Sequence, residues 1–253
     1  MSSAPTSASS AAPDCSAISA SKPRAALDRF AQLPFRDLGF ARADVHRELR
    51  QGAPEAVLGE GKTPQQVVEI VGAMLEAGAG TVLVTRADAD VRRGVRELAA
   101  DAHEHELARL VWVARAVPER RGVVTIVSAG TADGPVVHEA RVRAELLGTE
   151  VVVHEDVGVA GLHRLGPALP DLERADCVVV VAGMDAALAS VVGGLVAAPV
   201  IGVPTSVGYG VAAGGQSALN AMLTSCAAAL AVVGIDDGFG AGTIAARIAR
   251  GRE

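Results

Sequence analysis

The stretch from Ala186 to Ile235 contains no Asp, Glu, Lys, Arg or His, although charged residues make up 21% of the 253-residue chain. An apolar run of this length raises the question of a membrane span, for which about 20 residues suffice. Paired glycines, two prolines and the polar Gln216 and Asn220 divide it into pieces of strand and helix length. Lipid would leave the polar groups of such pieces without partners, so the run predicts the buried core of a folded domain.

Strand-like and helix-like patterns alternate along the second half of the chain. We expect strands in "VVTIVSAG", "EVVVHEDV", "CVVVVAG", "PVIGVPT" and "VGIDD", and helices in "DGPVVHEARVRAELLG", "MDAALASVVGGLV" and "GQSALNAMLTSCAAALAV". Apolar strands that alternate with helices imply a parallel sheet with helices on both faces, which explains the missing charge. The sequence therefore predicts an α/β fold with a three-layer, flavodoxin-like parallel-sheet domain.

The first half predicts a smaller α/β unit. Thr63, Pro64 and Gln66 have the spacing of a capping box with proline at the first helical position, so a helix should run from there to about Ala77. "TVLVTR" and "LARLVWVA" are strand-like, and "DADVRRGVRELAADA" between them is helix-like. "HEHE" (103–106) is expected to be a surface turn rather than a metal site.

These patterns divide the chain into three parts. We expect a disordered Ser/Ala-rich tail over 1–22, a small α/β domain over 23–118 and a parallel α/β catalytic domain over 119–253, with "PERRG" as the linker. The Gly-rich "DDGFGAG" near the end suggests contacts between subunits.

Charge and cysteine content narrow the function. A net charge of −6 without a basic stripe argues against nucleic acid as a partner, and the broken apolar run argues against a membrane. Cys15, Cys177 and Cys226 have neither disulfide nor metal-site spacing. An odd number of cysteines without a signal peptide favours free thiols and a cytoplasmic location.

Three loops should meet at one edge of the parallel sheet, because ligands of such sheets bind beyond the carboxyl ends of the strands. The loops are "SAGTADG", "AGMDA" and "PTSVGYGVAAGGQ". Small residues before a helix favour phosphate binding, although a tight turn with Asp133 as helix cap fits the spacing equally, and the GxGxxG and GxxxxGK[ST] fingerprints are absent. The expected substrate-binding residues in these loops are Ser128, Gly130, Thr131, Asp133, Gly183, Met184, Ser206, Gly208, Tyr209 and Gly210.

Asp185 and Cys226 each have two interpretations. Asp185 at a helix start can be a simple dipole partner or, in an apolar neighbourhood, a group for proton transfer. The helical pattern places Cys226 on one face with Leu219, Leu223 and Leu230, which is typical of a core residue, and several turns from the activating helix start.

The first domain carries a polar cluster in "RADVHR" and "GEGKT". Its basic members are Arg42, Arg47 and Lys62. A solvated surface and an anion site before a helix both fit this pattern.

Several long motifs, in order over about residues 38–245, resemble the LarB family of pyridinium-3,5-biscarboxylic acid mononucleotide synthases in nickel-pincer cofactor biosynthesis. They are "FARADVHRELRQGAPEAVLGEGKT", "SAGTADGPVVHEA", "AGMDAALASVVGGLV" and "PVIGVPTSVGYGVAAGGQSALNAMLTSCAAALAVVGIDDGFGAG". The second half also resembles the PurE-type aminoimidazole ribonucleotide carboxylases. Ala187 stands where that family's "AGxAAHLPG" motif has its catalytic histidine, which disfavours the purine-pathway activity.

The resemblance implies carboxylation of the pyridinium ring of nicotinic acid adenine dinucleotide with CO2, and hydrolysis of its phosphoanhydride with release of AMP. Cys226 matches the family's thiol position, and Asp185 stands where the family usually has Glu, as the candidate base. Mg²⁺ is expected, without an organic cofactor and with no assigned ligands. Asp133, Arg42, Arg47 and Lys62 are the candidates for the phosphoanhydride step.

The resemblance also implies a homo-oligomer, a dimer or a higher assembly such as an octamer. Two other functions stay open at this point. One is a carboxylase or mutase acting on another ribonucleotide, as aminoimidazole ribonucleotide carboxylase does. The other is a catalytically silent nucleotide-binding module.

Overall fold

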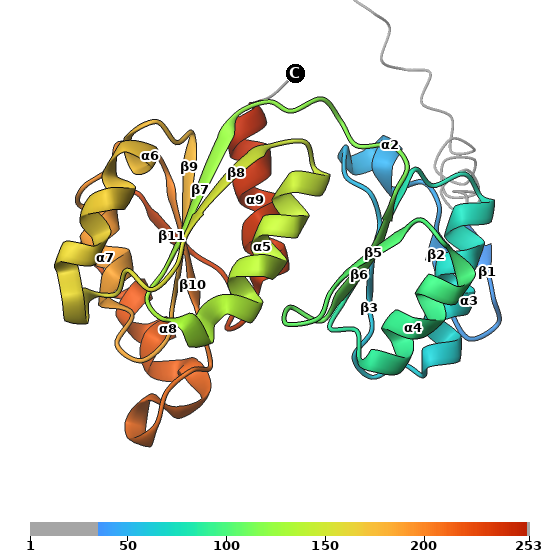
Figure 1. The fold of residues 1–253 in the computed structure, drawn as a ribbon, viewed down its shortest axis with the longest axis horizontal. Helices are drawn as coiled ribbons and strands as arrows, with labels where there is room; N and C mark the ends of the chain where they lie inside the picture. The colour runs from blue at the N-terminus through green and yellow to red at the C-terminus, as the bar shows by residue number, and fades with distance from the viewer. Residues whose placement is uncertain (1–34, 252–253) are drawn as a thin grey trace, which may run out of the picture.

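The computed structural model describes residues 35–251, which form two α/β units joined by an irregular segment between β6 and β7 (Figure 1). The expected tail with Cys15, and the start of the expected first domain, lie outside the described residues. Within the described part, no helix combines the length and the apolar character that a membrane crossing requires.

The second unit is built on a five-stranded sheet in the order β11-β10-β9-β7-β8, and every pair of neighbours in it is parallel. Its strands are β7 (Val123–Ser128), β8 (Glu150–His154), β9 (Cys177–Ala182), β10 (Val200–Pro204) and β11 (Leu230–Val232). The central strand β9 is a run of β-branched side chains that are all buried, as expected for a strand covered on both faces.

Helices cover both faces of this sheet (Figure 1). One face packs against α5 (Gly134–Leu146) and α9 (Gly238–Arg250), and the other against η3 (Val159–Ala168), α6 (Leu169–Glu173), α7 (Ala187–Gly193) and α8 (Gln216–Leu223). Alternate residues of β9 supply the two cores: Val179 and Val181 face α5 and α9, while Val178 and Val180 face the other layer. The predicted three-layer α/β architecture is confirmed.

The first unit begins with a hairpin of β1 (Phe35–Asp37) and β2 (Arg42–Asp44), followed by the short helix α2 (Arg47–Gln51). A four-stranded sheet follows, in the order β3-β4-β6-β5. Its elements are β3 (Ala56–Leu58), α3 (Pro64–Glu76), β4 (Thr81–Thr85), α4 (Ala89–Leu98), β5 (Ala102–His105) and β6 (Leu110–Ala114). The predicted capping box is present, because Thr63 and Gln66 exchange hydrogen bonds at the start of α3.

The two units share a buried interface. Leu83 of β4 and Leu110 of β6 pack with Val142 and Leu146 of α5, and Phe239 of α9 borders this cluster. The helices α5 and α9 therefore lie between the two sheets (Figure 1). Burial of each large aliphatic side chain stabilises the contact by about 1.5–3 kcal/mol, so the first unit is fixed against the second rather than tethered loosely.

Three expectations for secondary structure were wrong. "HEHE" is not a turn, because His103 to His105 belong to β5, which pairs with β6. The predicted long helix through Cys226 ends at Leu223, and the last strand is Leu230–Val232 rather than "VGIDD".

The Gly-rich "DDGFGAG" forms the start of α9. A side chain at Gly238 would lie 2.4 Å from the carbonyl oxygen of Val136, and one at Gly242 would lie 2.4 Å from that of Ala140. These glycines let α9 pack closely against α5 within one chain, so they do not require a contact between subunits.

Candidate functional site

Asp133 joins two of the three predicted loops at the carboxyl edge of the sheet. Its Oδ1 accepts a hydrogen bond of 2.7 Å from the Thr205 hydroxyl after β10, and its Oδ2 accepts one of 3.0 Å from the backbone N–H of Gly130 after β7. The side chain is only 3% exposed. Burial raises the pKa of Asp133, while the hydrogen bond from Thr205 opposes that shift. Asp133 therefore does more than cap a helix: its buried carboxyl group connects the loop after β7 to the loop after β10.

Close backbone packing fixes the loop after β9 in the same place. A side chain at Gly183 would lie 2.2 Å from the carbonyl oxygen of Val207 and 2.7 Å from the Thr205 hydroxyl. The next residue, Met184, donates its backbone N–H to the same Val207 oxygen at 3.0 Å. Only glycine fits at position 183, so the loops after β9 and β10 lie against each other.

Asp185 lies between two residues with strained backbone. Met184 and Ala186 have φ values of 53° and 54°, in the left-handed region that side chains disfavour. Asp185 itself is exposed, and its Oδ1 accepts a hydrogen bond of 3.2 Å from the backbone N–H of Ala187 at the start of α7. Such strain persists where surrounding contacts impose it and is common at ligand sites, so Asp185 is held at the surface of this edge by its neighbours.

The glycine-rich loop 206–215 is anchored at its first residue. The backbone N–H of Ser206 donates to Asp236 Oδ1 at 2.8 Å, and the backbone N–H of Asp236 donates to the carbonyl of Pro204 at 2.9 Å. Farther along the loop, Tyr209 is 75% exposed and Val211 is 95% exposed. The loop thus begins next to Asp133 and Thr205 and exposes apolar side chains in its middle.

Cys226 lies at the opposite end of the sheet. It is exposed and occupies the loop that leads from α8 into the amino end of β11. The Ser225 hydroxyl next to it is 2.7 Å from the hydroxyl of Ser190 in α7, while Asp185 precedes that helix. The seven residues of α7 span roughly 10 Å, and a side chain at Gly193, its last residue, would lie 2.8 Å from the Cβ of Ala227, so Cys226 lies beside the C-terminal half of this helix whereas Asp185 precedes its first residue. The pattern-based interpretation of Cys226 as a core residue was wrong.

The three basic candidates of the first unit lie in different places. The Arg42 side chain is 72% exposed, and its guanidinium lies beside Asp37 and over the Phe35 ring. Lys62 donates from Nζ to the carbonyl of Leu58 at 2.9 Å. Arg47 pairs with Glu55 and lines a cavity between the two units, so it alone of the three faces the second unit at this cavity.

Three residues at the site were not identified from the sequence. Asp236 anchors Ser206, and its carbonyl accepts a hydrogen bond of 3.2 Å from Arg86 Nη2 of the first unit. Glu139 on α5 is 6% exposed, and burial raises its pKa to about 7. "IDDGFGAG" and "HEA" contain Asp236 and Glu139, but only the packing of α5 against α9 and the first unit distinguishes them from ordinary surface acids.

The edge does not fit a metal site made by protein ligands alone. Over residues 35–251, no three His, Cys, Asp or Glu side chains are grouped so that they could hold an ion. Both oxygens of Asp133 already accept hydrogen bonds from protein donors. Mg²⁺ commonly binds through one or two carboxylates and the phosphates of a substrate. The carboxylates at this edge fit that arrangement, in which the substrate supplies the remaining ligands.

Comparison with known proteins adds to this geometry. Residues 35–115 match the family described as the LarB/PurE-like N-terminal domain, and residues 123–253 match the AIR carboxylase family. An uncharacterized protein of Methanocaldococcus jannaschii is 39% identical over 217 residues, which cover 82% of this chain and 83% of that protein.

Solved structures of PurE proteins match about half of the chain. Treponema denticola PurE is 22% identical with a TM-score of 0.41, and covers 51% of this chain and 80% of its own. A variant of Treponema denticola PurE2 is 20% identical with a TM-score of 0.42, at 52% and 80% coverage. The order of the two matched domains along the chain decides the assignment: the protein belongs to the LarB family, whose carboxylase-type second domain is PurE-like.

Proposed function

We propose that this protein carboxylates the pyridinium ring of nicotinic acid adenine dinucleotide with CO2 and hydrolyses the phosphoanhydride, which yields pyridinium-3,5-biscarboxylic acid mononucleotide and AMP. The observation that carries the proposal is the carboxyl edge of the sheet, where a buried acid fixes neighbouring loops in a family of carboxylases. Glycines there bring backbone N–H groups close to a ligand, which suits carboxylate and phosphate oxygens.

A cysteine explains how an electron-poor ring can attack CO2. The thiolate of Cys226 forms a C–S bond to the ring carbon beside carbon 5, and the ring electrons that it displaces make carbon 5 an enamine nucleophile. Carbon 5 then forms the new C–C bond to CO2. Asp185 removes the proton from carbon 5, the C–H electron pair restores the aromatic ring, and the C–S bond breaks to release the thiolate. Atoms and electrons balance without a redox partner.

A second copy of the chain would complete the site, because Cys226 of one chain lies beside the C-terminal half of α7 whereas Asp185 precedes its first residue. Exposed apolar side chains support this arrangement at both places: Leu223 is 63% exposed near Cys226, and Tyr209 and Val211 are exposed on the glycine loop. Uncovered apolar surface of this kind marks an interaction site. We therefore assign the thiol to one subunit and the base to its neighbour in a homo-oligomer.

The phosphoanhydride step needs positive charge, because negative charge develops on the departing AMP. Water adds to phosphorus, the bridging P–O bond breaks, and AMP leaves with the electron pair. Mg²⁺ that binds together with the phosphates of the substrate would neutralise that charge. Arg86 donates a hydrogen bond to the second unit next to the glycine loop, which makes its guanidinium a candidate for this positive charge.

Incubation of the full chain with nicotinic acid adenine dinucleotide, ¹³C-bicarbonate and Mg²⁺ tests the proposal. Mass spectrometry should find AMP and a mononucleotide that carries one added ¹³C carboxyl group. A parallel incubation with aminoimidazole ribonucleotide should yield no carboxylated product, because Ala187 occupies the position of the histidine in the purine-pathway motif. Absence of both products from the dinucleotide would refute the proposal, whichever result the second substrate gives.

A further inference from the structure

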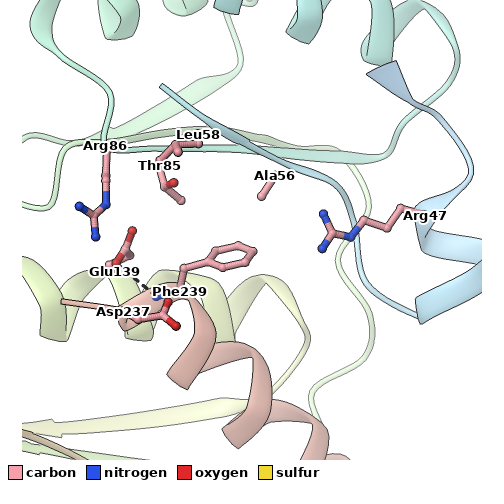
Figure 2. A pocket seen from close by; sticks show the side chains of 8 residues that line it. All are labelled: Arg47, Ala56, Leu58, Thr85, Arg86, Glu139, Asp237 and Phe239. Atoms are coloured by element: carbon pink, nitrogen blue, oxygen red, sulfur yellow. Dashed lines mark hydrogen bonds between the residues drawn. The ribbon is translucent and has the colours of Figure 1, made fainter. Parts of the chain in front are cut away.

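A cavity of about 200 Å³ lies between the two units, apart from the loops that hold Asp133 and Asp185. Its walls come from β3 and the end of β4 on one side, and from α5 and the start of α9 on the other (Figure 2). Whole-ligand pockets usually measure about 300–1,000 Å³. The volume therefore suits a single ring system rather than an entire dinucleotide.

One wall presents a carboxyl group that is well placed to recognise a ligand. Glu139 is 6% exposed, it accepts a hydrogen bond of 3.2 Å from the backbone N–H of Phe239, and its carboxyl group points across the cavity toward Arg86 (Figure 2). Asp237 also lines the cavity, but its Oδ1 already caps α9 through the N–H of Gly240 at 2.7 Å. A carboxyl group has two oxygens with several acceptor directions, so Glu139 retains capacity for a ligand.

A flat aromatic surface lies next to this carboxyl group. The Phe239 ring extends toward β3 between the two units (Figure 2), and the guanidinium of Arg143 lies over it, 4.4 Å from the ring centroid. Such a ring, with a carboxyl group at one side, is the arrangement that recognises a planar heteroaromatic base: the base stacks on the ring and donates its amino group to the carboxylate.

The cavity shares one lining residue with the surroundings of the proposed reaction site. Arg86 lines it and also donates from Nη2 to the carbonyl of Asp236 at 3.2 Å. Asp236 in turn accepts the N–H of Ser206 at 2.8 Å, at the start of the glycine loop. A guanidinium between a base pocket and this loop is suited to a phosphate group, which it can contact through several N–H donors.

We propose that this cavity binds the purine base of the adenylate half of the dinucleotide, with the base stacked on Phe239, its amino group hydrogen-bonded to Glu139 and its phosphate next to Arg86. The identity of the ligand rests on the proposed function; the presence of a base-sized pocket rests on the cavity itself. The first unit would then hold the leaving group while the edge loops hold the reacting ring.

Titration calorimetry with AMP on the full chain tests this assignment. Phe239→Leu keeps apolar volume but removes the flat face, and Ala56→Leu fills the cavity from the β3 side. Each should weaken AMP binding about tenfold, which lies within the range that stacking of one base accounts for. Phe40→Leu, at an exposed aromatic outside the cavity, is the matched control and should bind AMP normally.

The base itself supplies a second readout. IMP replaces the amino group of AMP with a carbonyl, so the wild type should prefer AMP, and Glu139→Gln should lower that preference. Glu145→Gln on the same helix is its control and should leave the preference unchanged. AMP affinities of Phe239→Leu and Ala56→Leu within about twofold of wild type, or a wild type that does not bind AMP, would overturn the assignment.

Turnover of the dinucleotide on the same preparations separates this inference from the proposed function. If the protein carboxylates the dinucleotide but the Phe239 and Ala56 substitutions leave AMP affinity unchanged, the proposed function holds and the base pocket is refuted. AMP binding that depends on both residues, without any carboxylation, would support the pocket and refute the function.

Discussion

The two ends of the five-stranded sheet differ in how firmly they hold their functional candidates. At the carboxyl end, Asp133 is buried between donors from neighbouring loops, and Met184 and Ala186 adopt strained backbone around Asp185. At the amino end, Cys226 is exposed in a loop and has no such enclosure. The carboxyl end is thus organised within one chain, whereas the thiol that we propose as nucleophile would need another surface to enclose it.

The largest expected loss of activity follows from substitution of Cys226, at the amino end of the five-stranded sheet. Cys226→Ala should abolish ring carboxylation, because the proposed mechanism makes the pyridinium ring nucleophilic through this thiol, and it should leave the thermal midpoint nearly unchanged because the side chain is exposed. Product analysis and thermal unfolding check the two halves of this prediction.

Cys177 provides the control for that substitution. It is fully buried in β9, and burial raises its pKa to about 12, so it supplies no thiolate at neutral pH. Cys177→Val should retain carboxylation. Normal turnover by Cys226→Ala would rule out covalent catalysis by this thiol and remove the reason for joining the two ends of the sheet.

At the carboxyl end, Asp133→Ala should lower kcat/KM about 100-fold, since misplacement of positioning groups by about 1 Å has that effect. It leaves the Thr205 hydroxyl and the Gly130 N–H without their buried acceptor, at a cost of about 1–3 kcal/mol in the free energy of unfolding. Kinetics and urea unfolding measure both. Unchanged kinetics with reduced stability would make Asp133 purely structural.

Between the two sheets, Glu139 should make stability depend on pH. Its folded pKa of about 7 exceeds the ordinary value of 4.5, so the folded state binds more protons than the unfolded state between these values. The free energy of unfolding should therefore fall as pH rises from 4.5 to above 7, by up to roughly 3 kcal/mol. Glu139→Gln should remove this part of the pH profile. An identical slope in the variant would contradict the burial of an ionisable carboxyl here.

The smallest effect concerns the strain beside Asp185. Ala186→Gly should raise the free energy of unfolding by about 0.5 kcal/mol, because glycine adopts a φ of 54° without the penalty that alanine incurs. Ala189→Gly, within α7, is the matched control and should destabilise by about 1 kcal/mol. Equal destabilisation by both substitutions would show that position 186 is not strained.

The sequence predicted much of the second unit because its signals are local. Val-rich strands such as β9, and the capping box at Thr63, determine their own structure through burial and hydrogen bonds between near neighbours. The glycines of α9 serve contact with α5, a helix about a hundred residues earlier in the chain, and the sequence did not predict this contact. Their spacing carries no sign of that partner.

The site shows the same division. The pattern of loops after strands located Asp133 and Gly183 at one edge, since topology alone brings them together. It could not locate Arg86 or Asp236, because their contact depends on how the first unit packs against α5 and α9. Nor could it place Cys226, because helical periodicity continues past Leu223 while the helix does not.

Co-expression of the Cys226→Ala and Asp185→Ala variants, each of which should be inactive alone, tests whether neighbouring subunits share one reaction site. Both side chains are exposed, so neither change should disturb folding. If the thiol of one subunit and the base of its neighbour share a site, random mixing leaves about one quarter of the sites with both groups, and carboxylation should recover to about a quarter of the wild-type rate. Activity that stays at the level of the separate variants would contradict a site shared between subunits.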